Sequence, residues 1–261
     1  MPFTLAHAAA AWPFRRTRLD ICAFIAGCFA PDFGYAVFVA PYALYGHTLP
    51  GLFVFDLPAG LLVLWLFHDY VKEPATIFLP KGIRERLEFS EKRFSLWPPA
   101  RLALTALSIL MGALTHIVWD SLTHEHYWPY RRWQALRLKV QLPVAGNVEV
   151  CKLLQYGSTL LGITVIAIWV WQWRRGSEPV DQPIPEPFTV AQKRMLIVAL
   201  PMMAVLGAVL RAYAGVALPA ATRSAMQYPG NMVISASAIL WVELLACGIV
   251  LRKREASRVP A

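Results

Sequence analysis

Three ionisable residues, His116, Asp120 and His124, follow one another at intervals of four in and after an apolar stretch. On an α-helix, residues four positions apart lie on one face, about 6 Å apart along the axis. His116 and Asp120 can therefore bind one ion together. His124 lies about 12 Å from His116, so we expect it to bind a second ion, a substrate phosphate or a neighbouring carboxylate. In apolar surroundings such groups are metal ligands, proton carriers or hydrogen-bonded structural groups.

The composition is that of a membrane protein with several spans. Of the 261 residues, 57% are hydrophobic and 16% are charged, whereas about 25% are charged in a typical soluble domain. The net charge of +9 would be compatible with nucleic-acid binding in a soluble protein. Here it is explained by Lys and Arg in loops on one side of a membrane. We expect a lipid bilayer as the partner and no nucleic acid.

A metal site in this chain would use nitrogen and oxygen ligands. The four cysteines form no CxxC pair, and most of them lie in apolar runs. This pattern indicates neither a disulfide framework nor a thiolate zinc site. Histidine and carboxylate ligands suit zinc, or alternatively manganese or iron. We therefore expect a divalent metal as cofactor, with zinc as the first choice.

The long apolar segments predict an all-α bundle of transmembrane helices. A helix needs about 20 apolar residues to cross a bilayer. Residues 19–46 are interrupted by Pro31 and Asp32, so this segment either crosses with a kink or re-enters. Five further segments are expected to cross fully: 51–71, 102–123, 153–173, 195–218 and 231–251. We divide the chain into a site-bearing membrane domain (1–175), a Pro-rich linker (176–194) and two accessory helices (195–261).

The distribution of Lys and Arg orients the chain in the membrane. Whether 19–46 crosses or re-enters, the side that holds the loop 72–101 carries more of them, which predicts that this loop is cytoplasmic and that 124–152 is not. Seven ionisable residues then fall towards the non-cytoplasmic side, where we expect one pocket. These residues are His7, Asp32, His47, Asp56, His116, Asp120 and His124.

Several motifs within about residues 1–175 resemble DUF4184, an uncharacterised bacterial family of integral membrane proteins. The motifs are MPFTLAH (1–7), APDF (30–33), HTL (47–49), GLFVFDLP (51–58), GALTH (112–116) and WDSLTH (119–124). Their order is distantly similar to that of LexA-regulated inner-membrane proteins named as metal-dependent hydrolases, and more weakly to that of zinc-dependent phospholipases C. The first of these similarities implies a metal site made of His7, Asp32, His47, His116 and Asp120.

These features predict a metal-dependent hydrolase at the outer side of the bacterial cytoplasmic membrane. Its substrate would be a lipid or a lipid-linked phosphoester, because the site lies at membrane depth. Asp56 or Asp120 would act as the general base or orient a ligand histidine. His124 and Gln155 would contact the substrate or support a ligand, although Gln155 could instead cap its own span.

Two other functions fit the same residues. In a transporter or ion pathway, the intramembrane carboxylates Asp32, Asp56 and Glu243 would carry protons or cations. In a purely structural membrane protein, the polar groups would pair internally for packing. A stoichiometric bound metal would favour the hydrolase, and activity retained after His116→Ala and Asp120→Ala would favour the structural alternative.

The predicted topology can be tested by cysteine labelling. Ser90→Cys and Tyr130→Cys are introduced singly into a variant whose native cysteines are replaced by serine. A membrane-impermeant maleimide added to intact cells should label residue 130 and not residue 90, because the Lys- and Arg-rich loop is expected to be cytoplasmic. Labelling of residue 90 alone would reverse the orientation and place the pocket on the cytoplasmic side.

Overall fold

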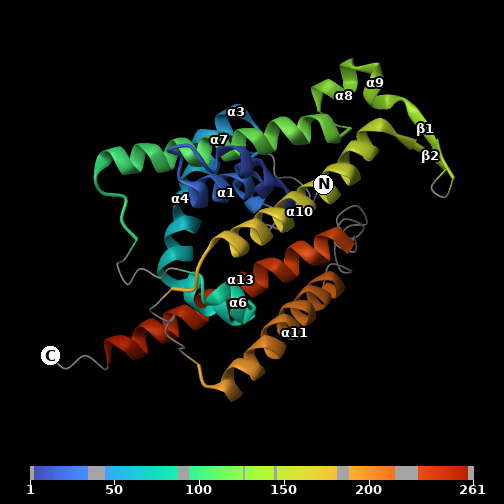
Figure 1. The fold of residues 1–261 in the computed structure, drawn as a ribbon. Coiled ribbons are helices and arrows are strands. Elements are labelled where there is room, and N and C mark those ends of the chain that lie inside the picture. Colours follow the sequence, from blue (N-terminus) through green and yellow to red (C-terminus); the bar gives the residue numbers. More distant parts are fainter. Residues whose placement is uncertain are drawn as a thin grey trace. The chain divides into compact units, whose positions relative to one another are not determined.

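The computed structural model describes residues 3–34, 45–87, 94–125, 127–143, 146–180, 188–214 and 229–257. Within these ranges the regular structure is helical apart from one two-stranded sheet (Figure 1). Five helical stretches in them are long and apolar enough to cross a membrane. They are Leu49–Phe78, Pro99–Arg132, Val150–Gly176, Val190–Ala212 and Met232–Arg254. This result confirms the predicted all-α transmembrane bundle with about five full spans.

The N-terminal apolar segment contains a helix that is too short to span a bilayer. It consists of α1 (Ile21–Phe29) and the 3-10 turn η2 (Ala30–Asp32). The Asp20 side chain caps α1 by accepting a hydrogen bond of 3.0 Å from the Ala23 backbone N–H. A proline in η2 ends the regular α-helical hydrogen bonding. Residues 35–44, on which the choice between crossing and re-entry depends, lie outside the described residues.

The described residues divide into two compact units, and the residues expected to line the pocket belong to the first. This unit comprises 3–33, 45–62 and 96–173. It contains α1, η2, η1 (Thr4–Phe14), α3 (Leu49–Gly51), the π-helical turn η3 (Leu52–Asp56), the first part of α4 (Leu57–Leu66), α7 (Pro99–Thr123), α8 (Trp128–Arg132), α9 (Gln134–Arg137), β1 (Lys139–Leu142), β2 (Gly146–Glu149) and most of α10 (Val150–Gly176).

Helix α7 is the central element of the first unit. Its buried residues recur every three to four positions, as expected for a helix that packs along one side. They are Thr105, Ser108, Ile109, Gly112, Ala113, His116, Asp120 and Thr123. His116 and Asp120 therefore lie on the face that α7 turns towards the interior of the unit.

Two glycines bring α1 and α7 into backbone contact. A Cβ atom at Gly27 would overlap the carbonyl oxygen of Ile109, and a Cβ atom at Gly112 would overlap that of Phe24. Small residues at a helix interface allow this close approach in membrane proteins. The contact holds the C-terminal end of α1 against the turn of α7 that leads to His116.

The segment 124–152, which we expected to be a loop on the non-cytoplasmic side, contains regular structure. Besides α8 and α9 it forms an antiparallel hairpin, in which Lys139 of β1 pairs with Glu149 of β2. Gly146 begins β2 with a φ of 69°, a conformation that glycine adopts without strain. The hairpin is largely exposed. Residues 137–142 (RLKVQL) alternate polar and apolar side chains, which is the pattern of a strand, and the expectation of a loop did not take this signal into account.

The second unit contains the described parts of 63–95 and of 174–257. Its core gathers Val71, Ile77, Leu200 and Leu244. The elements are the remainder of α4, the π-helical turn η4 (Phe67–Val71), α5 (Lys72–Ala75), η5 (Thr76–Phe78), α6 (Lys81–Arg84), α11 (Val190–Ala214) and α13 (Pro229–Ala256). Glu243, which the transport alternative requires, lies on α13 in this unit.

Gly112→Ala tests the contact between α1 and α7. The added methyl group meets the Phe24 carbonyl, so we expect a loss of stability of about 1–3 kcal/mol, as for other overpacked interiors. Thermal unfolding of the detergent-solubilised protein measures the effect. Gly157→Ala on α10 is the matched control, since a Cβ there meets nothing within 4 Å. Equal unfolding temperatures for the two variants would contradict the close contact.

Candidate metal centre

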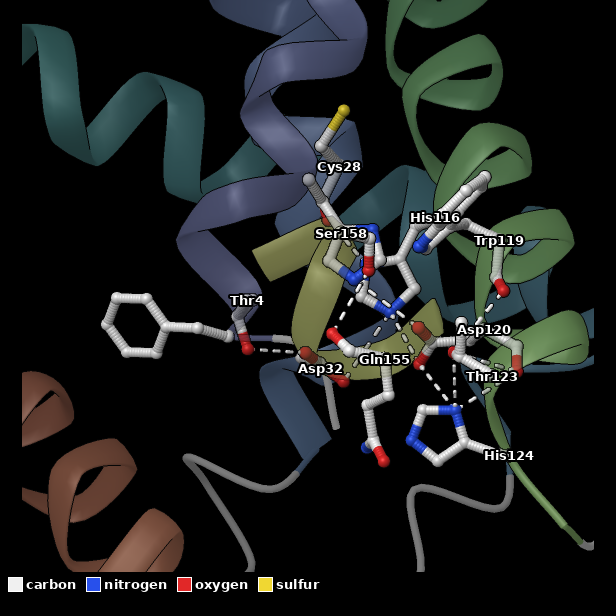
Figure 2. Close-up of polar contacts among 12 residues, drawn as sticks. Thr4, Cys28, Asp32, His116, Trp119, Asp120, Thr123, His124, Gln155 and Ser158 are labelled. Carbon is white, nitrogen blue, oxygen red and sulfur yellow. Dashed lines mark hydrogen bonds and ion pairs between the residues drawn. The ribbon is translucent and has the colours of Figure 1, made fainter. Parts of the chain in front are cut away.

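Five side chains from separate parts of the sequence meet in one cluster in the first unit. His7 comes from η1, Asp32 from η2 and His47 from the turn before α3, whereas His116 and Asp120 come from α7. The cluster is buried: the exposed fraction of His116 is 0% and that of Asp120 is 2%. Figure 2 shows Asp32, His116 and Asp120 turned towards one another.

The atoms of the cluster are spaced as ligands of a shared cation would be. Asp120 Oδ1 lies 3.3 Å from His7 Nε2, and Asp120 Oδ2 lies 3.4 Å from His116 Nε2 and 3.6 Å from His47 Nε2. Asp32 Oδ1 lies 3.5 Å from His47 Nε2 and 3.7 Å from His116 Nε2. Charge-assisted hydrogen bonds are shorter, about 2.7–2.9 Å. Zinc bonds of about 2.0–2.1 Å in a tetrahedron place neighbouring ligand atoms about 3.3–3.4 Å apart.

Several of these atoms are buried without a hydrogen-bond partner in the described part of the chain. They include His7 Nε2, His116 Nε2, Asp32 Oδ1 and Asp120 Oδ1. Leaving such a group unsatisfied costs about 1–3 kcal/mol, and more when it is charged. Because the four atoms belong to one cluster, a single kind of ligand, a cation, can satisfy them all.

Two overlapping sets of ligands are close enough to hold an ion. One is His7, His116 and Asp120, and the other is Asp32, His47 and His116, with the ligand atoms of each set within 4.8 Å of one another. The rings of His7 and His116 are stacked with centroids 3.9 Å apart. Two protonated rings in this arrangement would repel each other. The stack therefore disfavours charging both rings, and histidine binds a metal in its neutral form.

Backbone and hydroxyl groups orient the ligands. His116 Nδ1 lies 2.7 Å from the Cys28 carbonyl oxygen, so Nδ1 carries the proton and Nε2 faces the cluster as a free lone pair. Thr4 Oγ1 donates a hydrogen bond of 2.6 Å to Asp32 Oδ2, which leaves Asp32 Oδ1 for His47 and His116. Figure 2 shows both contacts.

Sequence reasoning missed both orienting groups. Thr4 lies three residues before His7 in the first motif, which is a weak signal because threonine is common in membrane helices. The Cys28 carbonyl has no sequence signal, since any residue there supplies the same backbone atom.

Asp56 lies beside this cluster and outside both ligand sets. It ends the π-helical turn η3, a type of turn that is frequent at functional sites. Its side chain is fully buried, and neither oxygen has a hydrogen-bond partner in the described chain. A Cβ atom at Gly46 would lie 3.0 Å from Asp56 Oδ1 and 2.6 Å from the Pro31 carbonyl oxygen. Gly46 therefore lets the turn that carries His47 pass close to both.

His124 and Gln155, the residues expected to contact the substrate or support a ligand, are also outside the two sets. His124 follows the last residue of α7, and its Nδ1 lies 3.0 Å from the Asp120 carbonyl oxygen and 3.8 Å from Asp120 Oδ2. The Gln155 side chain is buried, and its Oε1 accepts a hydrogen bond of 3.4 Å from Lys152. Neither contact assigns a role in binding a metal.

An apolar groove of about 350 Å³ adjoins the cluster. It is bounded by η1, α7 and α10, and His7 forms part of its wall. Its lining is mainly hydrocarbon, from residues that include Ala6, Ala10, Trp12, Trp119, Leu161 and Val165. A hydrocarbon chain lying in this groove would have one end beside a residue of the cluster.

A third group with ligand atoms, made of Glu125, Glu149 and Cys151, lies elsewhere in the first unit. Its carboxylates already have partners, because Lys152 pairs with Glu125 at 2.9 Å and the Tyr130 hydroxyl donates to Glu149 at 2.7 Å. The geometry of this group therefore gives no reason to add a cation.

The family model described as a domain of unknown function, DUF4184, matches residues 1–251. The chain belongs to this family. The resemblance identified from the motifs is confirmed, and it extends beyond the expected residues 1–175 to include the last two helices. Neither the curated proteins nor the solved structures contain a match. The description of DUF4184 names no reaction.

The role of Thr4 in orienting Asp32 can be measured through metal affinity. Thr4→Val keeps the shape but removes the hydroxyl, and we expect the affinity for zinc to fall about tenfold to 100-fold, as for other groups that orient metal ligands. Competition with a chelating dye gives the dissociation constant. Thr164→Val is the control, because Thr164 Oγ1 donates to the Leu160 carbonyl of its own helix. An unchanged affinity for Thr4→Val would remove this role.

Proposed function

We propose that this protein is a metal-dependent hydrolase that acts on a lipid or a lipid-linked phosphoester at the outer side of the bacterial cytoplasmic membrane. The observation that carries the proposal is that buried nitrogen and oxygen atoms without hydrogen bonds in the described chain belong to two overlapping sets close enough to hold a cation. Histidine and aspartate ligands suit zinc, and also manganese or iron.

The residues around the cluster have distinct proposed tasks. Asp32, His47, His116, His7 and Asp120 hold the metal. When bound, the ion lowers the pKa of its water towards about 7 and polarises the oxygen of the scissile group. The Cys28 carbonyl and Thr4 keep His116 and Asp32 in their binding orientations.

Asp56 is the proposed general base, because it is a buried carboxylate beside the cluster with both oxygens available. In hydrolysis, it accepts a proton from the attacking water, whose oxygen forms the new bond to phosphorus. The bond from phosphorus to the alcohol oxygen breaks, and that oxygen takes a proton from solvent water. Asp56 then returns its proton to the hydroxide left in solvent. Asp120 faces the cluster directly, which makes it a ligand rather than the base in this scheme.

The apolar groove supports a lipid as the substrate. His7 lines the groove and also faces Asp120 across 3.3 Å. A lipid whose chain lies between η1, α7 and α10 would present its headgroup to the cluster. This arrangement keeps the chain out of water and the polar headgroup beside polar side chains.

The charge distribution supports the outer location. With the loop 72–101 in the cytoplasm, Asp56 lies near the outer end of the span Leu49–Phe78, and Asp120 lies in the outer half of the span Pro99–Arg132. A substrate in the outer leaflet would reach both. This location is tested by the labelling experiment on residues 90 and 130.

Hydrolysis can be tested in detergent micelles that contain phospholipids and isoprenoid phosphates. We expect phosphate-ester cleavage that stops on chelation and returns with zinc. Asp56→Asn should lower the turnover about 10²- to 10⁴-fold, the usual contribution of a general base, while leaving metal bound. Mass spectrometry of the lipid products gives the rate, and Glu178→Gln is the control because Glu178 is exposed in the second unit.

Activity that survives chelation, or that His116→Ala retains, would contradict the metal-dependent mechanism. Metal binding without hydrolysis of any lipid in the panel would contradict the hydrolase. Absence of both would favour a structural role for the cluster.

A further inference from the structure

We propose that the cluster binds two divalent cations, bridged by the carboxylate of Asp120, and that its substrate is therefore a phosphoester rather than a carboxylic ester. The inference rests on the proposed metal-dependent function and specifies the number of ions, their ligands and the substrate class. It is carried by the directions in which the two oxygens of Asp120 point and by the buried carboxyl groups around them.

The cluster and Asp56 beside it contain three buried carboxyl groups. Asp32, Asp56 and Asp120 are 6%, 0% and 2% exposed. Within the described chain, the ion pairs of Asp32 and Asp120 all involve histidine, and none involves Lys or Arg. Divalent ions bound here would offset the charge of the carboxylates and lower the penalty for burying it.

Four ligand atoms surround the first position. Asp32 Oδ1, His47 Nε2, His116 Nε2 and Asp120 Oδ2 are joined by four separations of 3.4–3.7 Å. Each of these separations suits neighbouring ligands with bonds of about 2.0–2.2 Å, and the ligand atoms of Asp32, His47 and His116 lie within 4.8 Å of one another. In the proposed centre, Asp120 Oδ2 is the fourth protein ligand of the first ion.

The second position lies on the other oxygen of Asp120. His7 Nε2 is 3.3 Å from Oδ1 rather than Oδ2, so the two carboxylate oxygens face different histidines. A carboxylate used in this way bridges ions about 3.5–4 Å apart. His116, which is also in the set with His7 and Asp120, binds the first ion in this proposal. The second ion would then keep His7 and Asp120 as protein ligands, and water or substrate would complete its coordination. His7 also lines the apolar groove, which places this open ion on the substrate side.

The arrangement favours phosphoesters. Two ions at this separation stabilise both the attacking and the leaving oxygen of an in-line displacement at phosphorus. Attack on a carboxylic ester develops charge on a single oxygen, which one ion or an oxyanion hole can stabilise. The first ion would be bound by four protein ligands, and the second would have coordination positions free for water or substrate. Such a pair suits hydrolysis of a phosphoester better than hydrolysis of a carboxylic ester.

Binding of Mn²⁺ alone tests the inference without relying on activity. The full-length protein in detergent is stripped with a chelator and titrated with Mn²⁺, and the bound metal is counted by mass spectrometry. Wild type should bind about 2 equivalents and give the electron paramagnetic resonance spectrum of an exchange-coupled pair, as expected for ions about 3.5–4 Å apart. His7→Ala and His7→Gln should each bind one equivalent with an uncoupled spectrum. His68→Ala in the second unit is the matched control and should retain the coupled pair.

The outcomes separate this inference from the proposed function. One equivalent in wild type, or a coupled pair that persists in both His7 variants, would overturn the two-ion centre. No bound metal would overturn the centre and the proposed function together. A coupled pair in wild type with faster cleavage of carboxylic esters than of phosphoesters would overturn the substrate class. The wild-type stoichiometry and spectrum decide the number of ions even if a variant fails to fold.

Discussion

The close contact between α1 and α7 determines most of what the first unit can do. Because Gly27 and Gly112 have no side chains, the two helices approach until backbone meets backbone. The end of α1 then lies beside His116, and the Cys28 carbonyl can accept its hydrogen bond. The same approach brings η2, with Asp32, to the level of Asp120. A side chain at either glycine would push α1 away from α7. Asp32, which follows α1, would then move away from His116 and Asp120 on α7.

The cluster contains buried polar atoms without hydrogen bonds in the described chain, and such atoms destabilise a fold and are rare in native proteins unless they have a function. Its buried nitrogen and oxygen atoms face one another at distances too long for strong hydrogen bonds. A purely structural network would be expected to shorten these contacts or to replace them with apolar packing, which is often as stable as a buried ion pair. Asp69 in the second unit is a carboxylate with ordinary hydrogen bonding, since it accepts hydrogen bonds from the Trp65 side chain and from the Phe94 backbone.

The sequence predicted the helical bundle well because length and hydropathy alone identify segments that can cross a bilayer. It also led us to expect that His7, Asp32, His47, His116 and Asp120 would lie together, because their levels in the membrane follow from topology. It could not predict the hydrogen bond from Thr4 to Asp32, which depends on how η1 packs against η2. The hairpin of β1 and β2 was missed although residues 137–142 alternate polar and apolar side chains, because the segment is short and lies among Trp, Tyr and Arg residues typical of a loop at the membrane interface.

The N-terminal helix η1 is a 3-10 helix of 11 residues, although such helices seldom exceed one turn. With three residues per turn, positions three apart lie directly above one another. Thr4, His7, Ala10 and Pro13 therefore form one straight row, whereas an α-helix would wind them around its axis. Within this row, Thr4 donates a hydrogen bond to Asp32, and His7 is a ligand of the cluster. Ala10 and Pro13 form part of the groove wall. The alignment of the groove with the metal centre thus depends on the three-residue turn of η1. Inserting one residue after His7 would rotate Ala10 and Pro13 by a third of a turn about the helix axis, while His7 and the other ligands would stay in place.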